Sequence, residues 1–73
     1  MKKKQYPHYE IGERLSDLMY AQNMTDKELA KRIGKERKTI CSYRHNESEM
    51  GVVTLMKICS VLNTTPNYLL YGR

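Results

Sequence analysis

The chain has 73 residues, of which 13 are Lys or Arg and eight are Asp or Glu, so its formal net charge is +5. This length corresponds to one small domain near the lower limit at which a hydrophobic core alone stabilises a fold, which argues against a deep catalytic pocket. No apolar run approaches the roughly 18 residues that a membrane span needs, and no signal-peptide segment follows the opening lysines, so we expect a cytoplasmic protein without membrane contact.

Residues 1–9, MKKKQYPHY, are predicted to form a flexible basic tail, because Pro7 interrupts regular structure and no periodic pattern appears. Residues 10–73 are predicted to form a single domain. Its first helix should run from Ile11 to about Asn23. The apolar residues that recur at helical spacing in this segment are Ile11, Leu15, Leu18 and Met19.

The second helix is predicted from its end signals. Thr25 is expected as the N-cap, with Glu28 completing a capping box three residues later and Met24 packing against the helix start. Gly34 is expected to end the helix in a left-handed conformation. The inward-facing residues should be Leu29, Ala30 and Ile33.

The third helix, about residues 36–44, has a thin apolar face, formed by Ile40 and Tyr43, and a basic opposite face. Between Lys27 and His45 lie seven Lys or Arg residues and two Glu residues, a net of +5 that equals the charge of the whole chain. A compact helical pair that carries all the excess positive charge is typical of a polyanion-binding protein, and DNA is the first candidate.

A loop is predicted over residues 45–51, followed by a fourth helix over residues 52–62. The buried stripe expected on this helix consists of Val52, Leu55, Met56, Cys59 and Leu62. A last short helix should begin with Thr65 as its cap and Pro66 in its first turn, and end at Gly72. The sequence therefore predicts an all-α, compact fold of five helices.

These segments resemble a known family when they are taken in order. IGERLSDLM, MTDKELAKRIG, TICSYRHN, TLMKICSVLN and TPNYLLYG, between Ile11 and Gly72, fall at the spacing of the XRE-like helix-turn-helix family of phage repressors and Cro proteins. The resemblance implies a repressor-like bundle in which the second helix lies across the backbone of double-stranded DNA and the third enters the major groove. It also implies a pseudo-palindromic operator and a homodimer, at least on DNA.

The resemblance assigns residues to this interface by position. The base-facing residues would be Arg37, Lys38 and Ser42. Arg37 can donate two hydrogen bonds to guanine, Lys38 can contact guanine or hold phosphate, and Ser42 adds little selectivity. Backbone contacts are expected from the amides that begin the second helix and from Thr25, Lys35, Thr39, His45 and Asn46.

The last helix is expected to supply the dimer contacts. The residues assigned to this interface are Asn67, Tyr68, Leu70 and Tyr71. An exposed Leu and Tyr pair is typical of an interface. Alternatively, Tyr68 or Leu69 closes the core.

The chain departs from the family pattern at four acidic residues, Asp26, Glu36, Glu47 and Glu49. Asp26 stands where members commonly have Gln, and a carboxylate there suits the helix dipole but repels phosphate. Glu36 occupies the usual cap position of the third helix. Alternatively to weakening backbone binding, its carboxylate accepts a hydrogen bond from cytosine. The family's common ion pair between an Arg of the first helix and a Glu late in the third is replaced by Met19 and Arg44.

The predicted function is that of a small sequence-specific DNA-binding regulator, which acts by occupying an operator and needs no small-molecule ligand. The acidic departures motivate an alternative from another class, a protein-interaction module, antitoxin-like or anti-repressor, with the same fold and weak DNA affinity. Binding that weakens steeply as salt rises would distinguish the first from the second.

No enzyme activity, metal site or cofactor is predicted. Cys41 and His45 lie one helical turn apart on an open face, where nothing supplies an oxyanion site or excludes water. Cys41 and Cys59 can in principle pair, but their spacing matches no redox or zinc motif. We interpret both as reduced thiols.

Overall fold

The computed structural model describes residues 10–72, and it confirms the predicted all-α fold. Its helices are α1 (Glu10–Ala21), α2 (Asp26–Ile33), α3 (Arg37–Arg44), α4 (Val52–Leu62) and α5 (Pro66–Tyr71). No strand occurs among the described residues. The predicted tail, residues 1–9, lies outside them.

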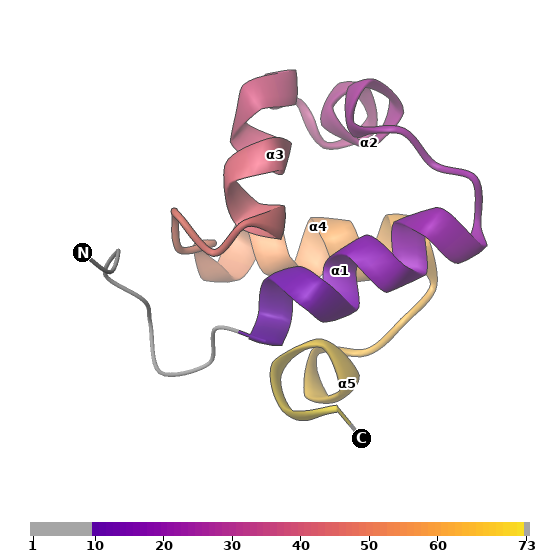
Figure 1. Ribbon diagram of the computed structural model, residues 1–73, viewed down its shortest axis with the longest axis vertical. Coiled ribbons are helices and arrows are strands. Elements are labelled where there is room, and N and C mark those ends of the chain that lie inside the picture. The colour runs from indigo at the N-terminus through magenta and orange to yellow at the C-terminus, as the bar shows by residue number, and fades with distance from the viewer. Residues whose placement is uncertain (1–9, 73) are drawn as a thin grey trace.

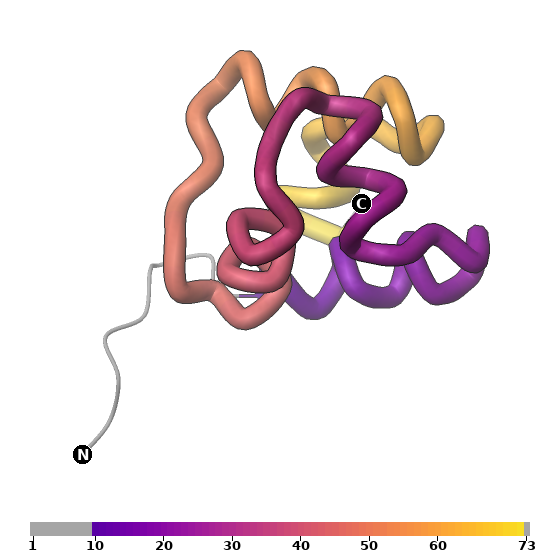
Figure 2. The backbone as a smooth tube through the Cα atoms, turned by 90° about the horizontal axis from the view of Figure 1, so that it is seen from above, coloured from indigo at the N-terminus to yellow at the C-terminus, as the bar shows by residue number. Residues whose placement is uncertain are grey.

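The α2–α3 pair and α5 lie at opposite ends of the molecule, with α1 and α4 between them (Figure 1). α3 packs on both α2 and α1, α2 also packs on α4, and α5 packs on α1 and α4. Figure 2 shows the same arrangement from above, with the loop after α3 passing along one side to reach α4. The α2–α3 pair therefore packs on α1 and α4 and leaves its other side exposed.

The core takes at least one fully buried aliphatic side chain from every helix. These side chains are Leu15, Leu29, Ile40, Ile58, Leu62 and Leu69. Burying each of them contributes roughly 1.5–3 kcal/mol relative to exposure. The two anchors predicted for α3 are confirmed, since Ile40 is fully buried and Tyr43 is 7% exposed.

The buried stripe predicted for α4 is wrong at its first two turns. Val52 is 72% exposed and Met56 is 60% exposed, whereas Thr54 and Ile58 are buried. The segment VVTLMKICSVL is apolar on nearly every side, so its periodicity does not define one face. Packing against α2 and α5 decides which side is buried. The predicted burial of Cys59 and Leu62 is confirmed, and Leu55 is partly buried against the core.

The end signals of α2 act as predicted. The Glu28 amide donates to Thr25 Oγ1 at 3.1 Å, and the Thr25 amide donates to Glu28 Oε1 at 3.0 Å, which completes the capping box. Gly34 has φ +77°, and its amide donates to the Ala30 carbonyl. The start and the end of α2 are thus both determined by short-range interactions.

α1 ends two residues before the predicted Asn23. Asn23 adopts a left-handed conformation, with φ +54°, and the Met24 amide donates to the Met19 carbonyl at 2.8 Å. Asn is one of the few residues that tolerate this conformation, so it turns the chain towards Thr25. α5 begins and ends as predicted, with Thr65 Oγ1 accepting from the Tyr68 amide at 3.1 Å.

Candidate nucleic-acid interface

The turn between α2 and α3 presents α3 to solvent on one side. Position 34 requires glycine because its φ of +77° is strained for a residue with a Cβ. Lack of space is not the reason, since a Cβ there would meet no atom within 4 Å. Ile40 and Tyr43 hold the inner side of α3 in the core. The residues at the other helical positions of α3 therefore point away from the bundle.

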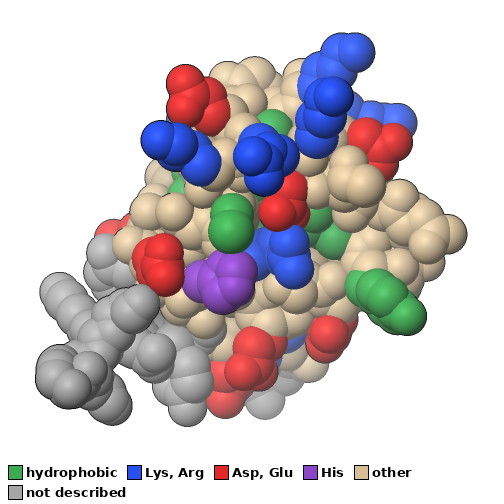
Figure 3. All heavy atoms as spheres, turned by 45° about the horizontal axis from the view of Figure 1, so that its top comes forward, with side chains coloured by type: hydrophobic (Ala, Val, Ile, Leu, Met, Phe, Trp, Pro, Cys, Tyr) green, Lys and Arg blue, Asp and Glu red, His purple; other side chains and the backbone are tan. Residues whose placement is uncertain are grey.

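Exposed cations cover α2, the turn and the first residues of α3. They are Lys27, Lys31, Arg32, Lys35, Arg37 and Lys38, all of them in the exposed class. Within residues 26–45 seven basic residues outnumber three acidic ones, a net of +4, whereas the rest of the described chain has two basic and five acidic residues, a net of −3. In Figure 3 the Lys and Arg side chains gather in the upper half of the face, with acidic side chains among them.

The structure places the three predicted base-contacting residues on the outer side of α3. Arg37 is its first residue and is exposed, Lys38 follows it and is also exposed, and Ser42 is half-buried one turn further on. Arg37 and Lys38 are therefore accessible to a ligand on this side of the helix, and their contacts with base edges stay a prediction.

Three of the residues predicted to contact phosphate lie close to the ends of α2 and the start of α3. Lys35 is exposed within the turn, and Thr39 is half-buried in the first turn of α3. Thr25 is exposed, but its oxygen already accepts the Glu28 amide. A contact from Thr25 to phosphate would therefore use the hydrogen of its hydroxyl group.

His45 follows the last residue of α3, and its ring is bonded to that helix. His45 Nδ1 lies 2.8 Å from the carbonyl oxygen of Cys41 and 3.6 Å from the Cys41 Sγ atom. A carbonyl oxygen only accepts, so Nδ1 carries the hydrogen and Nε2 of the neutral ring is an acceptor. A hydrogen bond from His45 to phosphate therefore requires the imidazolium form.

Asn46 connects the end of α3 to the start of α1. Its backbone is left-handed, with φ +60°, and its Oδ1 accepts the Gly12 amide at 3.0 Å. Gly12 is buried, and a Cβ added to it would stand 2.4 Å from the carbonyl oxygen of Arg44. The side-chain oxygen of Asn46 is thus used within the fold, so its predicted phosphate contact would have to come from the side-chain amide nitrogen.

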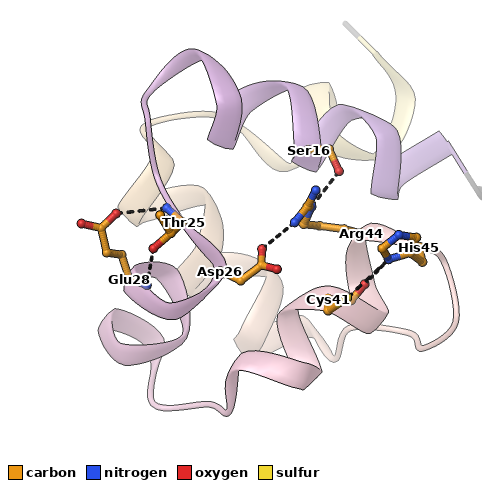
Figure 4. A network of polar contacts seen from close by, with 7 residues as sticks. All are labelled: Ser16, Thr25, Asp26, Glu28, Cys41, Arg44 and His45. Carbon is orange, nitrogen blue, oxygen red and sulfur yellow. Dashed lines mark hydrogen bonds and ion pairs between the residues drawn. The ribbon is translucent and has the colours of Figure 1, made fainter.

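Arg44 and Asp26 form an ion pair that was not predicted from the sequence. Arg44 Nη1 lies 2.7 Å from Asp26 Oδ1, and Arg44 Nε donates to Ser16 Oγ at 3.0 Å, as Figure 4 shows. Arg44 is therefore not one of the exposed cations, and the carboxylate of Asp26 is compensated within the protein. Met19, the position expected to replace the family's Arg, is in the core at 3% exposure.

Two members of this arrangement, Ser16 and Gly12, were not predicted as site residues. Ser16 reads as an ordinary polar position of an amphipathic helix. Gly12 did carry a signal, because an isolated glycine inside a helix costs about 1 kcal/mol relative to alanine and often marks close packing.

The predicted dimer residues differ in exposure. Asn67 and Tyr71 are exposed, Tyr68 and Leu70 are half-buried, and Leu69 is fully buried. Leu69 is therefore the residue of α5 that closes the core. Arg14 fixes the end of this helix, since its Nε donates to the Leu69 carbonyl at 2.9 Å and its Nη2 donates to the Leu70 carbonyl at 2.8 Å.

Other kinds of site are not evident in the described residues. Cys41 and Cys59 are free thiols, and burial raises the pKa of the Cys59 thiol. Residues 10–72 contain no group of three or more His, Cys, Asp or Glu side chains arranged to hold a metal ion. Within the same residues no helix combines the length and the apolar character needed to cross a membrane.

Solved structures share this fold. The P22 c2 repressor, solved with a synthetic operator in the presence of Tl⁺, is 25% identical, with a TM-score of 0.83 over 86% of this chain and 96% of that chain. The restriction-modification controller protein C.AhdI from Aeromonas hydrophila is 23% identical, with a TM-score of 0.78 over 82% of this chain and 91% of that chain. The second likeness concerns the fold alone.

Sequence comparisons give the family. No curated protein matches the chain. The family model of the Cro/C1-type helix-turn-helix DNA-binding domain matches residues 14–71, which include α2, its Gly34 turn and α3. The basic α2–α3 pair described above is thus the characteristic unit of a known DNA-binding domain, and the chain belongs to the Cro/C1-type helix-turn-helix family.

Proposed function

We propose that this DNA-binding regulator acts by occupying an operator sequence, with α3 in the major groove and α2 across the phosphate backbone. The observation that carries the proposal is the set of six exposed cations on α2, the turn and α3, whereas the described residues outside 26–45 carry a net charge of −3. A cluster of exposed positive charge of this kind attracts the phosphate backbone during approach. Its mechanism is steric, because a bound copy excludes other proteins from the same stretch of duplex.

In this proposal the side chains of α3 divide into two groups. Arg37, Lys38 and Ser42 face the bases, and the two hydrogen bonds that Arg37 can donate to guanine provide discrimination of about 1–3 kcal/mol. Phosphate contacts position the helix without adding sequence information. The residues proposed for them are Thr25, Lys35, Thr39, His45 as imidazolium, and Asn46 through its amide nitrogen.

The proposed assembly on DNA is a homodimer on a pseudo-palindrome. Half-sites one helical turn apart are separated by about 34 Å, and the described part of one copy measures 34 × 27 × 23 Å. Two copies bound at adjacent half-sites are therefore neighbours on the duplex. The proposed contact surface is the exposed side of α5, formed by Asn67, Tyr68, Leu70 and Tyr71.

We also propose that residues 10–73 act as one domain. The protein is proposed to work in the cytoplasm, and its membership of a DNA-binding family supports this location. The structure of the P22 c2 repressor, which contains a synthetic operator, supports operator binding by analogy. The proposal needs no cofactor and no small-molecule ligand.

Selection of bound sequences from a random duplex pool, at low and at near-physiological salt, tests the proposed function. We expect an inverted repeat with guanine at a fixed position of each half-site, and an affinity for it that falls steeply with salt. Salt-sensitive binding without a recovered motif would contradict sequence readout. It would favour the protein-interaction module, and the search would then move to protein partners.

A further inference from the structure

The C-terminal end of α3 is attached to both preceding helices through one side chain. The guanidinium of Arg44 bonds Ser16 of α1 through Nε, at 3.0 Å, and Asp26 of α2 through Nη1, at 2.7 Å. Figure 4 shows Arg44 between these two residues. The guanidinium is planar and its donors point in fixed directions, so both bonds can form only over a narrow range of helix orientations.

The surroundings of this pair favour a well-defined geometry. The side chains of Asp26 and Arg44 are 17% and 33% exposed, so the ion pair is partly withdrawn from solvent and screened less than a surface pair. The backbone of Arg44 also lies against α1, because its carbonyl oxygen would be only 2.4 Å from a Cβ on Gly12. The end of α3 is thus in contact with α1 through both its backbone and its side chain.

At its other end α3 is connected to α2 by the short turn that contains Gly34. No atom lies within 4 Å of the place where a Gly34 Cβ would stand, so side-chain packing does not brace the turn at that residue. The eight residues of α3 span about 12 Å. A rotation of about 5° around the turn would therefore move the far end of the helix by about 1 Å, and it would swing the long side chains of Arg37 and Lys38 through the same angle.

We infer that Arg44 is a positioning residue for DNA readout: by bonding Ser16 and Asp26 it sets the orientation of α3 relative to α1 and α2, and it is not a phosphate-binding cation. The inference rests on the proposed function, since it concerns how α3 reads an operator. It also gives Asp26 a role opposite to that of a carboxylate which merely repels DNA. Asp26 holds the guanidinium that orients the recognition helix.

Asp26→Asn separates the two roles, because they predict opposite results. If the Asp26 carboxylate only repels phosphate, its neutralisation should tighten binding to every duplex. If Asp26 holds Arg44, Asp26→Asn weakens binding to the selected operator about tenfold, while binding to a scrambled duplex of the same length and composition stays unchanged or becomes tighter. The ratio of the two dissociation constants, measured at one salt concentration, is the readout.

Asp17→Asn is the matched control. Asp17 is exposed on α1 and has no ion pair within the described part of the chain, so the variant makes the same change of charge without releasing Arg44. We expect the operator-to-scrambled ratio of Asp17→Asn to equal that of the unmodified protein. Thermal unfolding of each variant, with binding measured well below the transition, keeps a loss of folding separate from a loss of readout.

Arg44→Gln and the Asp26→Asn/Arg44→Gln double variant complete the test. The double variant should lose no more discrimination than the worse single variant, because either change already removes the same ion pair. Equal weakening of operator and scrambled binding by Arg44→Gln, with a salt slope reduced by about one unit, would overturn the inference and make Arg44 a phosphate contact. Tighter operator binding by Asp26→Asn would also overturn it.

The experiments distinguish failure of this inference from failure of the proposed function. The inference fails while the function stands if the unmodified protein selects a motif and Asp26→Asn leaves discrimination intact. The proposed function fails if the unmodified protein selects no motif.

Discussion

Arg37 and Lys35 stand two residues apart on either side of the start of α3, and both are exposed, yet they should serve DNA binding differently. Arg37→Ala is expected to lose about 1–3 kcal/mol of discrimination at one base position, because it removes a bidentate donor. Lys35→Ala should weaken binding to all sequences alike and reduce the salt slope by about one unit. Competition titrations with single-base variants of the selected operator measure both effects. Unchanged binding in both variants would contradict the placement of α3 in the groove.

The two cysteines offer a test of burial by chemistry. Cys59 is 4% exposed, and burial raises the pKa of its thiol above the ordinary value of 9.0. Because the thiolate is the reactive form, we expect an alkylating reagent to modify the half-buried Cys41 much faster than Cys59. Mass spectrometry of the labelled protein, with and without urea, measures this. Equal rates in the folded protein would contradict the burial of Cys59.

The same thiol gives a direction to the pH dependence of stability. A group whose pKa is higher in the folded than in the unfolded state binds its proton more tightly when folded. The contribution of Cys59 is therefore fully present below the unfolded value of about 9 and is lost as pH rises through the higher, folded value. Cys59→Ala should make the decline of unfolding free energy at alkaline pH shallower, and an unchanged decline would show that other groups cause it.

At the scale of a helix, α4 shows the limit of periodicity. Its sequence VVTLMKICSVL offers several apolar faces, and the structure buries the one that contains Thr54 and Ile58 while leaving Val52, Val53 and Met56 more than half exposed. α2 is the opposite case. Its capping box and its Gly34 end involve residues at most four positions apart, and both were predicted from sequence because such interactions depend little on the rest of the fold.

A pair of truncations two residues apart tests the orientation of α4. Ile58→Ala removes a side chain with 0% exposure and is expected to cost about 2–5 kcal/mol of unfolding free energy. Met56→Ala truncates a residue that is 60% exposed and should change stability by no more than about 0.5 kcal/mol. Urea denaturation with comparison of m-values provides the measurement. A loss for Met56→Ala as large as that for Ile58→Ala would restore the buried stripe predicted from the sequence.

At the scale of the whole molecule, the basic surface of α2 and α3 is separated from the surface proposed for dimer contacts. The basic α2–α3 pair and the proposed dimer helix α5 lie at opposite ends (Figure 1), so a second copy can contact α5 without covering the cations. The contact area offered by six residues of α5 is small against the roughly 800 Å² per partner of a standard interface. We therefore expect dimerisation to depend on DNA, where both copies are held on one duplex.

Tyr71→Ala tests this dependence. Tyr71 is 55% exposed on α5, and its removal should weaken binding to a two-half-site operator about tenfold while binding to a single half-site stays unchanged. Val53→Ala, which truncates an apolar residue 67% exposed on α4, is the control and should leave both affinities unchanged. A loss for Val53→Ala alone would place the contact between copies on the start of α4 instead.

The sequence by itself determined the five helices, the capping box of Thr25 and Glu28, the left-handed Gly34 and the outward basic side of α3. These features follow from spacing and from contacts within a few residues, so a linear pattern expresses them. Only the tertiary structure decided which side of α4 is buried and which residues Arg44 bonds. Ser16 and Asp26 are separated from Arg44 by 28 and 18 positions. Such partners are chosen by the packing angles of whole helices, and several angles are compatible with one apolar pattern.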